Sequence, residues 1–208
     1  MNIKVCGITQ LKQLQQLDGL NIEFAGLIFV KDYPRYVGDK LDKEAVKNAD
    51  FDLKKVGVFK NPEMIDVLDA IDEYGLDIVQ LHGEESVEFC RKLKELLPNL
   101  MTIKVLHASA GFQPEDATRY EADAIMLDAF HAELRGGTGQ VFDWTLGRRT
   151  RELVPRLFLA GGLSPENVAE AIAEVQPYAV DACSSIELAP GLKDAGRMRA
   201  FVSAVRSI

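Results

Sequence analysis

The sequence predicts an α/β protein built as a single (β/α)8 TIM barrel, a parallel eight-stranded barrel with outer helices. Short apolar segments typical of strands alternate with amphipathic segments typical of helices eight times along the 208 residues. Strict alternation gives a parallel sheet with crossover helices, and eight units are the number that closes a barrel. The rival architecture is an open doubly wound sheet. Neither a Gly-x-Gly-x-x-Gly motif after the first strand nor a Gly-x4-Gly-Lys loop is present to support it.

Turn and cap residues delimit the expected elements. Gly7 ends the first strand, and leucines at helical spacing follow it. Asn-Pro-Glu at residues 61–63 and Ser-Pro-Glu at residues 164–166 are typical of helix starts, with the cap residue first and proline second. The expected strands are residues 3–6, 23–29, 55–59, 77–83, 101–106, 123–128, 156–160 and 179–182. The expected helices begin near residues 9, 42, 61, 85, 114, 144, 164 and 194.

Length and composition restrict the possible functions. The chain has no linker or low-complexity segment, so one domain over residues 1–208 is expected. The net charge is −8 and the sequence pI is about 5.0, which argues against a nucleic-acid partner because no surplus of Lys and Arg is available to neutralise phosphates. Apolar runs reach only strand length, so no membrane span is expected. Nothing in the sequence indicates an obligate protein partner.

The cysteines indicate the compartment. Cys6, Cys90 and Cys183 are an odd number, are widely spaced and follow no metal-ligand pattern, so no metal site is expected. Reduced thiols in a cytoplasmic protein fit this usage best. The first strand begins at residue 3, which leaves no room for a signal peptide.

The first strand carries an unusual pair of side chains. Lys4 and Cys6 share one face because side chains alternate along a strand, and Cys6 stands at the carboxyl end, where barrels place their chemistry. Taken alone, Cys6 is more simply a small buried hydrophobic residue. A buried Lys4 needs a partner, and Asp181 lies in the eighth strand, which closes against the first. We therefore expect a Lys4–Asp181 ion pair that places a positive charge near Cys6.

Polar side chains also stand at the carboxyl ends of two other strands. Gln80 and His82 share a face of the fourth strand, and Asp128 ends the sixth. A carboxylate at the end of an apolar strand is costly to bury unless it is paired or functional. On the residues alone, Asp128 is either a catalytic or a capping carboxylate, and His82 is either a functional or a hydrogen-bonded structural histidine.

Two loops have the composition of a phosphate site. Gly161-Gly162 follows the seventh strand, and Cys183-Ser184-Ser185 follows the eighth. Small residues let backbone N–H groups approach an anion, and the loops after these two strands often bind phosphate in barrels. An ordinary turn is the simpler explanation for either loop taken alone. Because the two loops follow adjacent strands, a phosphate site is favoured. Arg35, on a loop at the same end, is either a cation for an anionic substrate or a solvated surface residue.

A series of motifs in chain order connects the sequence with a known family. The motifs are Lys4-Val5-Cys6-Gly7-Ile8-Thr9, Pro34-Arg35-Tyr36-Val37, Val56-Gly57-Val58-Phe59, Gln80-Leu81-His82-Gly83-Glu84-Glu85-Ser86, Leu127-Asp128, Gly136-Gly137-Thr138-Gly139, Phe142-Asp143-Trp144, Ala160-Gly161-Gly162-Leu163, Pro165-Glu166-Asn167-Val168, Ala189-Pro190-Gly191 and Lys193-Asp194. Together they closely resemble the phosphoribosylanthranilate isomerases of tryptophan biosynthesis.

The resemblance implies a cofactor-free Amadori rearrangement of N-(5-phosphoribosyl)anthranilate, a small phosphorylated substrate, to 1-(2-carboxyphenylamino)-1-deoxyribulose 5-phosphate. It implies Cys6 as the general base and Asp128 as the general acid. Arg35, Gln80 and His82 are expected to bind the substrate, Arg35 at its anthranilate end. Gly161, Gly162, Ser184 and Ser185 are expected to bind its phosphate. The family commonly has Ser-Ser-Gly where this chain has Cys183-Ser184-Ser185, so the backbone of that loop is expected to differ.

The residues taken alone leave two other functions open. Another phosphate-binding sugar isomerase or epimerase barrel would share the loops after strands seven and eight, but would not need Cys6 together with Asp128. A catalytically silent binding barrel is the alternative outside enzymes.

Because Cys183 follows the strand next to that of Cys6, we expect the two thiols to lie near each other, both reduced.

Overall fold

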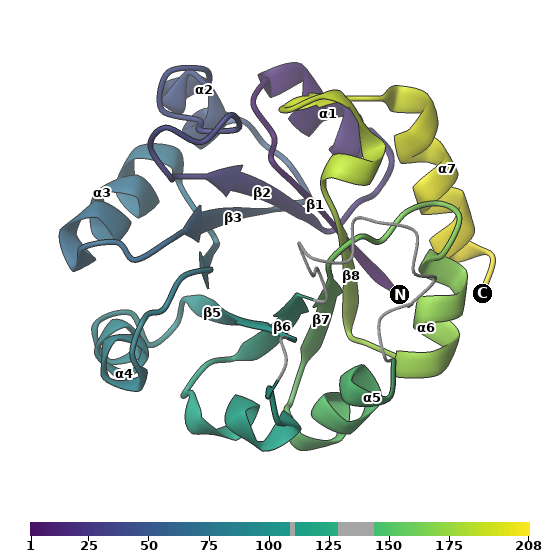
Figure 1. Cartoon of the computed structure of the whole chain (residues 1–208). Coiled ribbons are helices and arrows are strands. Elements are labelled where there is room, and N and C mark those ends of the chain that lie inside the picture. Colours follow the sequence, from purple (N-terminus) through teal and green to yellow (C-terminus); the bar gives the residue numbers. More distant parts are fainter. Residues whose placement is uncertain (109–110, 129–143) are drawn as a thin grey trace.

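The computed structural model describes residues 1–108, 111–128 and 144–208. Eight strands form a closed barrel in which each strand pairs in parallel with the next along the chain and β8 pairs with β1, which confirms the predicted TIM barrel (Figure 1). The strands are β1 (Asn2–Cys6), β2 (Phe24–Ile28), β3 (Lys54–Phe59), β4 (Ile78–Leu81), β5 (Met101–His107), β6 (Ala124–Asp128), β7 (Leu157–Ala160) and β8 (Ala179–Ala182).

Helices surround the barrel on the outside (Figure 1). They are α1 (Leu11–Gly19), α2 (Lys43–Asn48), α3 (Met64–Tyr74), α4 (Val87–Leu96), the 3-10 helix η1 (Pro114–Arg119), α5 (Trp144–Leu153), α6 (Val168–Val175) and α7 (Ala195–Arg206). Among the described residues, no helix combines the length and the apolar character that a bilayer crossing requires.

Side-chain alternation divides the apolar residues into two cores. One set faces the barrel axis and includes Val56, Ile103, Val105, Met126 and Phe158. The residues between them on the same strands face outward and pack against the helices. A residue two positions beyond an axis-facing one therefore also faces the axis, which brings the polar side chains at the ends of the strands together above the inner core.

The predicted cap at residue 61 was wrong. Helix α3 begins three residues later, after Glu63, and Asn61 has a left-handed φ of 49°. Its side-chain oxygen accepts a hydrogen bond from the Glu84 N–H (2.6 Å), and its own N–H donates to the Glu85 carboxylate (2.8 Å). Asn61 thus joins the segments after β3 and β4, and these contacts across the rim override its local preference for a cap.

Other boundaries also differ from the prediction. Helix α6 begins after Asn167, because Ser164 opens a preceding turn in which its carbonyl accepts from the Val168 N–H (3.0 Å). The segment near residue 114 is a 3-10 helix. The expected loop at residues 136–139 and the motif residues 142 and 143 lie outside the described residues.

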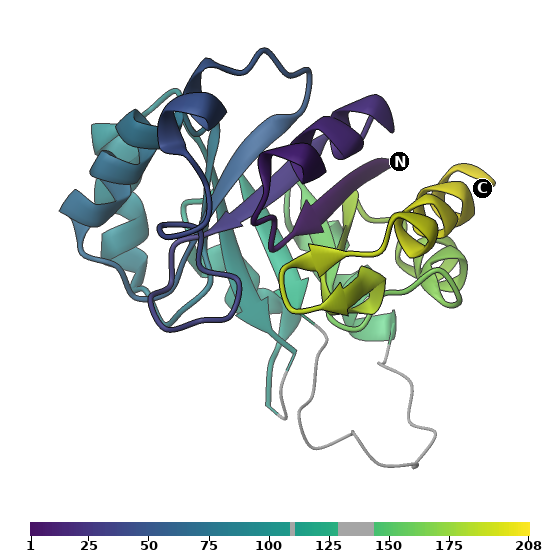
Figure 2. The ribbon, with the colours of Figure 1, turned by 90° about the horizontal axis from the view of Figure 1, so that it is seen from above.

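A hairpin after β8 was not predicted. It follows the 3-10 turn η3 (Ser184–Ile186) and consists of the antiparallel strands β9 (Glu187–Ala189) and β10 (Leu192–Lys193). In Figure 2 the hairpin lies beside the start of α1, where the hydroxyl of Thr9 donates to the carbonyl of Gly191 (2.6 Å). This packing brings Glu187 and Lys193 to the rim near the end of β1.

Candidate active site

An ion pair joins the first and last strands inside the barrel, as predicted. Lys4 is fully buried, and its Nζ lies 3.0 Å from Oδ1 of Asp181, which is its register partner on β8. Burial opposes the ammonium charge, but the Asp181 carboxylate and the nearby Cys6 outweigh it and raise the pKa of Lys4. Lys4 therefore remains charged at neutral pH. It lies two residues before Cys6 on the same face of β1.

Cys6 lies at the carboxyl end of β1 and is almost fully buried. A hydrogen bond from the thiol of Cys183 lowers the pKa of Cys6 against the effect of burial, and the ammonium charges of Lys4 and Lys193 lower it further. The same hydrogen bond, together with burial, raises the pKa of Cys183. Cys183 is therefore the hydrogen-bond donor of the pair, and Cys6 is the thiol that ionises first.

Two glycines leave room for this arrangement. A Cβ atom on Gly26, in the neighbouring strand β2, would lie 2.7 Å from the Cys6 sulfur. Gly7 has a φ of 78°, and a Cβ atom there would lie 2.6 Å from Cδ of Arg35. Gly7 thus lets the chain turn directly after Cys6 and lets Arg35 cross close above it.

Removing the Lys4 charge is expected to change the pH dependence of any reaction that uses the Cys6 thiolate. In Lys4→Met the pKa of Cys6 rises, so the ascending limb of kcat/KM moves to higher pH, and activity at neutral pH falls by roughly tenfold. Steady-state rates across pH measure this effect. Lys12→Met removes one charge from an exposed position of α1 and should leave the profile unchanged. A Lys4→Met profile that coincides with the parent's would contradict the role of Lys4.

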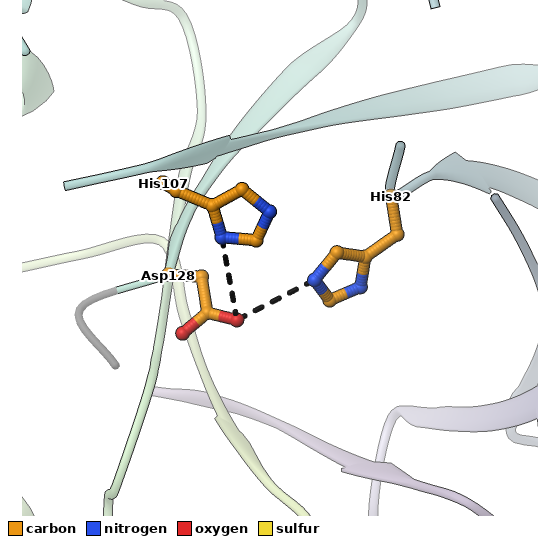
Figure 3. Close-up of side chains that lie close together, drawn as sticks. All are labelled: His82, His107 and Asp128. Atoms are coloured by element: carbon orange, nitrogen blue, oxygen red, sulfur yellow. Dashed lines mark ion pairs between the residues drawn. The ribbon is translucent and has the colours of Figure 1, made fainter. Parts of the chain in front are cut away.

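Asp128 lies at the end of β6 between two imidazoles (Figure 3). Its Oδ2 is 3.4 Å from Nε2 of His82 and 4.0 Å from Nδ1 of His107. His107 was not predicted as a site residue, because the fifth strand was expected to end at residue 106. The signal was the alternation of Ile103 and Val105, which places His107 on the face toward the barrel axis. Partial burial lowers the pKa of His107 despite the Asp128 carboxylate, so its ring is neutral at pH 7.

Gln80 is fully buried below His82. Its Nε2 lies 3.2 Å from Nδ1 of His82, and within the described part of the chain its Oε1 is buried without a hydrogen-bond partner. In this orientation the amide donates to Nδ1, which leaves the proton of a neutral imidazole on Nε2, facing Asp128. Gln80 therefore orients His82.

Arg35 is held by residues that the sequence analysis missed. Its guanidinium donates to both carboxylate oxygens of Glu187 (2.9 and 3.1 Å from Nε), and Lys193 Nζ lies 2.8 Å from the same carboxylate. Burial opposes the charge of Glu187, but the hydrogen bonds from Arg35 and Lys193 keep its pKa below the usual value. Arg35 is thus fixed at the rim above Gly7, and it is not the freely solvated side chain that was the simpler alternative.

The two candidate phosphate loops lie side by side at the ends of β7 and β8. Gly161 and Gly162 have φ values of 91° and 73°, which favour glycine, and a Cβ atom on Gly162 would meet open space. The hydroxyl of Ser185 donates to the carbonyl of Leu163, which links the two loops, while Ser184 is exposed. The hydroxyl of Ser185 therefore braces the two loops against each other.

A separate groove lies outside the barrel rim. It has a volume of about 650 Å3 and runs between the segment after β2 and helix α3, with Tyr36 and Tyr74 among its lining residues. It contains none of the site residues that the sequence predicted. The predicted site residues lie instead at the rim of the barrel, where the strands end.

Comparison with known proteins gives consistent results. A family model described as N-(5'phosphoribosyl)anthranilate (PRA) isomerase matches residues 3–204. The N-(5'-phosphoribosyl)anthranilate isomerase of Rubrobacter xylanophilus is 40% identical over 206 residues, which cover 99% of this chain and 98% of that protein. The one of Syntrophus aciditrophicus is 40% identical over 204 residues, which cover 98% and 86%.

Solved structures agree with the sequence relatives. The phosphoribosyl anthranilate isomerase of Thermotoga maritima has a TM-score of 0.88 at 34% identity, with both chains covered completely. A phosphoribosyl anthranilate isomerase solved in complex with reduced 1-(o-carboxyphenylamino)-1-deoxyribulose 5-phosphate has a TM-score of 0.83 at 32% identity, again over 100% of both chains.

The closed parallel barrel, with ionisable side chains gathered where its strands end, defines a (β/α)8-barrel enzyme. The matches extend over almost the whole chain and agree with the motifs in its sequence. The chain belongs to the family of N-(5'-phosphoribosyl)anthranilate isomerases, the isomerases of tryptophan biosynthesis.

Proposed function

We propose that the chain converts N-(5-phosphoribosyl)anthranilate into 1-(2-carboxyphenylamino)-1-deoxyribulose 5-phosphate, with Cys6 as general base and Asp128 as general acid. The observation that carries this assignment is the placement of the two groups. Cys6 ends β1 and Asp128 ends β6, both at the same rim and both on the face toward the barrel axis. A 32% identical isomerase solved with a reduced form of this product supports the choice of substrate.

The first chemical step needs an acid. Protonated Asp128 gives its proton to the furanose ring oxygen while the C1–O bond breaks and the amine lone pair forms a C1=N bond. The open-chain iminium results, and Asp128 is left as a carboxylate. The neighbouring His82, whose Nε2 lies 3.4 Å from Asp128, holds the carboxyl group in place.

The second step needs a base. The Cys6 thiolate removes the proton at C2 of the sugar, and the electrons of that C–H bond move toward the iminium to give an enolamine. The Asp128 carboxylate then takes the proton of the C2 hydroxyl and the Cys6 thiol gives its proton to C1, which yields the aminoketose and returns both groups to their starting forms without any oxidant or cofactor. The lowered pKa of Cys6 favours the thiolate, the form that can act as a base.

The remaining assignments concern binding. Arg35 binds the anthranilate carboxylate from its fixed position above Gly7, with Gln80 and His82 contacting the sugar. The backbone around Gly161, Gly162, Ser184 and Ser185 binds the phosphate, because two linked loops of small residues present N–H groups to an anion. Further parts of the proposal are a single domain over residues 1–208, action in the reducing cytoplasm, and no need for a metal, a nucleic acid or an obligate protein partner.

Arg35→Ala is expected to raise KM by roughly tenfold or more with little change in kcat, since a hydrogen bond to a charged group contributes about 1.5–3 kcal/mol. Glu187→Gln should cause a smaller rise in KM because it loosens the guanidinium. Arg91→Ala, which removes an exposed arginine from α4, is the matched control and should leave KM unchanged. A loss confined to kcat in Arg35→Ala would show that Arg35 does not hold the ground-state substrate.

Turnover of freshly prepared N-(5-phosphoribosyl)anthranilate, followed by the loss of anthranilate fluorescence, tests the function itself. Conversion to the aminoketose is the expected result. A protein that isomerises another phosphorylated sugar, but not this one, would be a different barrel isomerase. A protein that binds phosphorylated sugars without turning any over would be the silent binding barrel.

A further inference from the structure

The carboxyl ends of three neighbouring strands bring two imidazoles and a carboxylate into one cluster (Figure 3). His82 follows β4, His107 ends β5 and Asp128 ends β6. One ligand atom from each, counted as a ring nitrogen or a carboxylate oxygen, lies within 4.8 Å of the others. The side chains of His82, His107 and Asp128 are 30%, 56% and 17% exposed, so an ion from solvent can reach them.

This set of donors suits a particular class of ion. Imidazole nitrogens and a carboxylate oxygen bind Zn2+, Co2+ and Ni2+ well, whereas Mg2+ and Ca2+ prefer oxygen ligands alone. Ligand atoms of a tetrahedral zinc ion lie about 3.4 Å apart, given metal–ligand bonds of about 2.0–2.2 Å. The His82–Asp128 distance of 3.4 Å already has this value, and the His107–Asp128 distance of 4.0 Å needs only a small rotation of a half-exposed ring.

Gln80 adds an independent structural feature. It contacts Nδ1 of His82 at 3.2 Å from below, so the other ring nitrogen points toward Asp128. A histidine ligand donates its other ring N–H to an acceptor, which fixes the nitrogen that binds the metal. Oε1 of Gln80 is buried and, within the described residues, lacks a hydrogen-bond partner, so turning the Gln80 amide over lets this oxygen accept from Nδ1–H and frees Nε2 of His82 for an ion bound between the three strands.

We propose that the barrel mouth binds one divalent transition-metal ion, of the Zn2+ class, through His82, His107 and Asp128. Water completes the coordination. The ion is an inhibitor of the isomerase, not its cofactor, because a carboxylate that coordinates a metal cannot carry the proton that ring opening requires. This inhibitory effect rests on the proposed role of Asp128, whereas binding of the ion does not.

The thiols of Cys6 and Cys183 are the rival site for the same ion. They are hydrogen-bonded to each other, and thiolate sulfur is a stronger zinc ligand than imidazole. The two sites are distinguished by Co2+, because sulfur ligation adds an intense near-ultraviolet charge-transfer band that nitrogen and oxygen ligation does not produce. Variants separate them further, since His107 and Cys183 each belong to one site only.

The experiment titrates the purified protein with Co2+, followed by visible absorbance, and then displaces the Co2+ with Zn2+. His107→Ala, or His107→Gln if the smaller side chain impairs folding, is expected to weaken Co2+ binding by at least roughly tenfold, while Cys183→Ala binds as the parent does. The inference is overturned if both His107 variants bind Co2+ as tightly as the parent, or if binding is lost only in Cys183→Ala.

Activity measurements then test the inhibition. Zn2+ should inhibit the parent and a chelator should restore its turnover, whereas the turnover of His107→Ala, compared with the same variant without metal, should resist Zn2+. If metal binding depends on His107 but Zn2+ leaves the turnover of the parent intact, the metal site is confirmed and the acid role of Asp128 is refuted. In that way a failure of the metal site and a failure of the proposed mechanism give different results.

Discussion

Cys6→Ala and Asp128→Asn are each expected to lower kcat by at least roughly 10²–10⁴-fold, the usual contribution of a positioned acid or base. Cys6→Ala removes a thiol whose environment favours the thiolate, whereas the pKa of Cys90 and of Cys183 is raised, and Asp128→Asn leaves a side chain that cannot deliver a proton. KM should change far less, because Arg35 and the phosphate loops are untouched. Initial rates with freshly prepared substrate measure both constants.

Two conservative variants provide controls for these measurements. Cys90→Ala removes a buried thiol that packs against the outside of the barrel, and Asp66→Asn alters an exposed carboxylate on α3. Both should retain the parental kcat. An Asp128→Asn enzyme with near-parental kcat would mean that the acid lies elsewhere, and His82 would be the next candidate because it lies 3.4 Å away.

Lys104→Met is expected to cost about 3–5 kcal/mol of the free energy of unfolding, because it leaves a buried carboxylate unpaired. Lys104 points outward from β5 and is nearly fully buried, and its Nζ lies 2.6 Å from Glu85 and 2.7 Å from the Gly83 carbonyl. Glu85 also accepts hydrogen bonds from the N–H groups of Asn61 and Gly83. One ion pair thus fixes the segments after β3 and β4, including the one that carries His82.

Urea denaturation followed by circular dichroism measures this cost. Lys43→Met breaks an ion pair whose side chains are 47% and 45% exposed, and it should change stability by no more than about 1 kcal/mol. The double variant Lys104→Met with Glu85→Gln should recover part of the loss, since no buried charge is then left unpaired. If Lys104→Met is no more destabilising than Lys43→Met, the buried pair contributes little to stability.

The fold and the ion pair under Cys6 could be predicted from the sequence because they depend on regular patterns. Eight alternating units fix the closure of β8 against β1, and alternation along each strand fixes which side chains face the axis. Together these two regularities place Lys4 opposite Asp181, and the structure confirms the pair. Had the fifth strand been extended by one residue, the same alternation would have placed His107 on the face toward the barrel axis.

Other features depend on contacts between distant segments that no local pattern contains. Glu187 holds Arg35 only because the hairpin of β9 and β10 folds back onto the start of α1. The prediction of a helix cap at Asn61 failed for the same reason, since the N–H of Glu84 recruits its side chain. Sequence patterns therefore located the strand ends that form the site, but not the side chains that brace it.

Two pH titrations test whether Cys6 is the general base of the reaction. The thiolate absorbance of the protein, taken as the difference between parent and Cys6→Ala, gives the ionisation of Cys6. Burial raises the pKa of Cys90 to about 11, and the pKa of Cys183 is also raised, so neither ionises in the range of Cys6. If Cys6 is the base, its thiol ionises at a pH well below that of an ordinary thiol, and kcat/KM rises with the same midpoint. A thiol that remains protonated while the enzyme is fully active, or a kcat/KM profile that rises at a different pH, would contradict this role of Cys6.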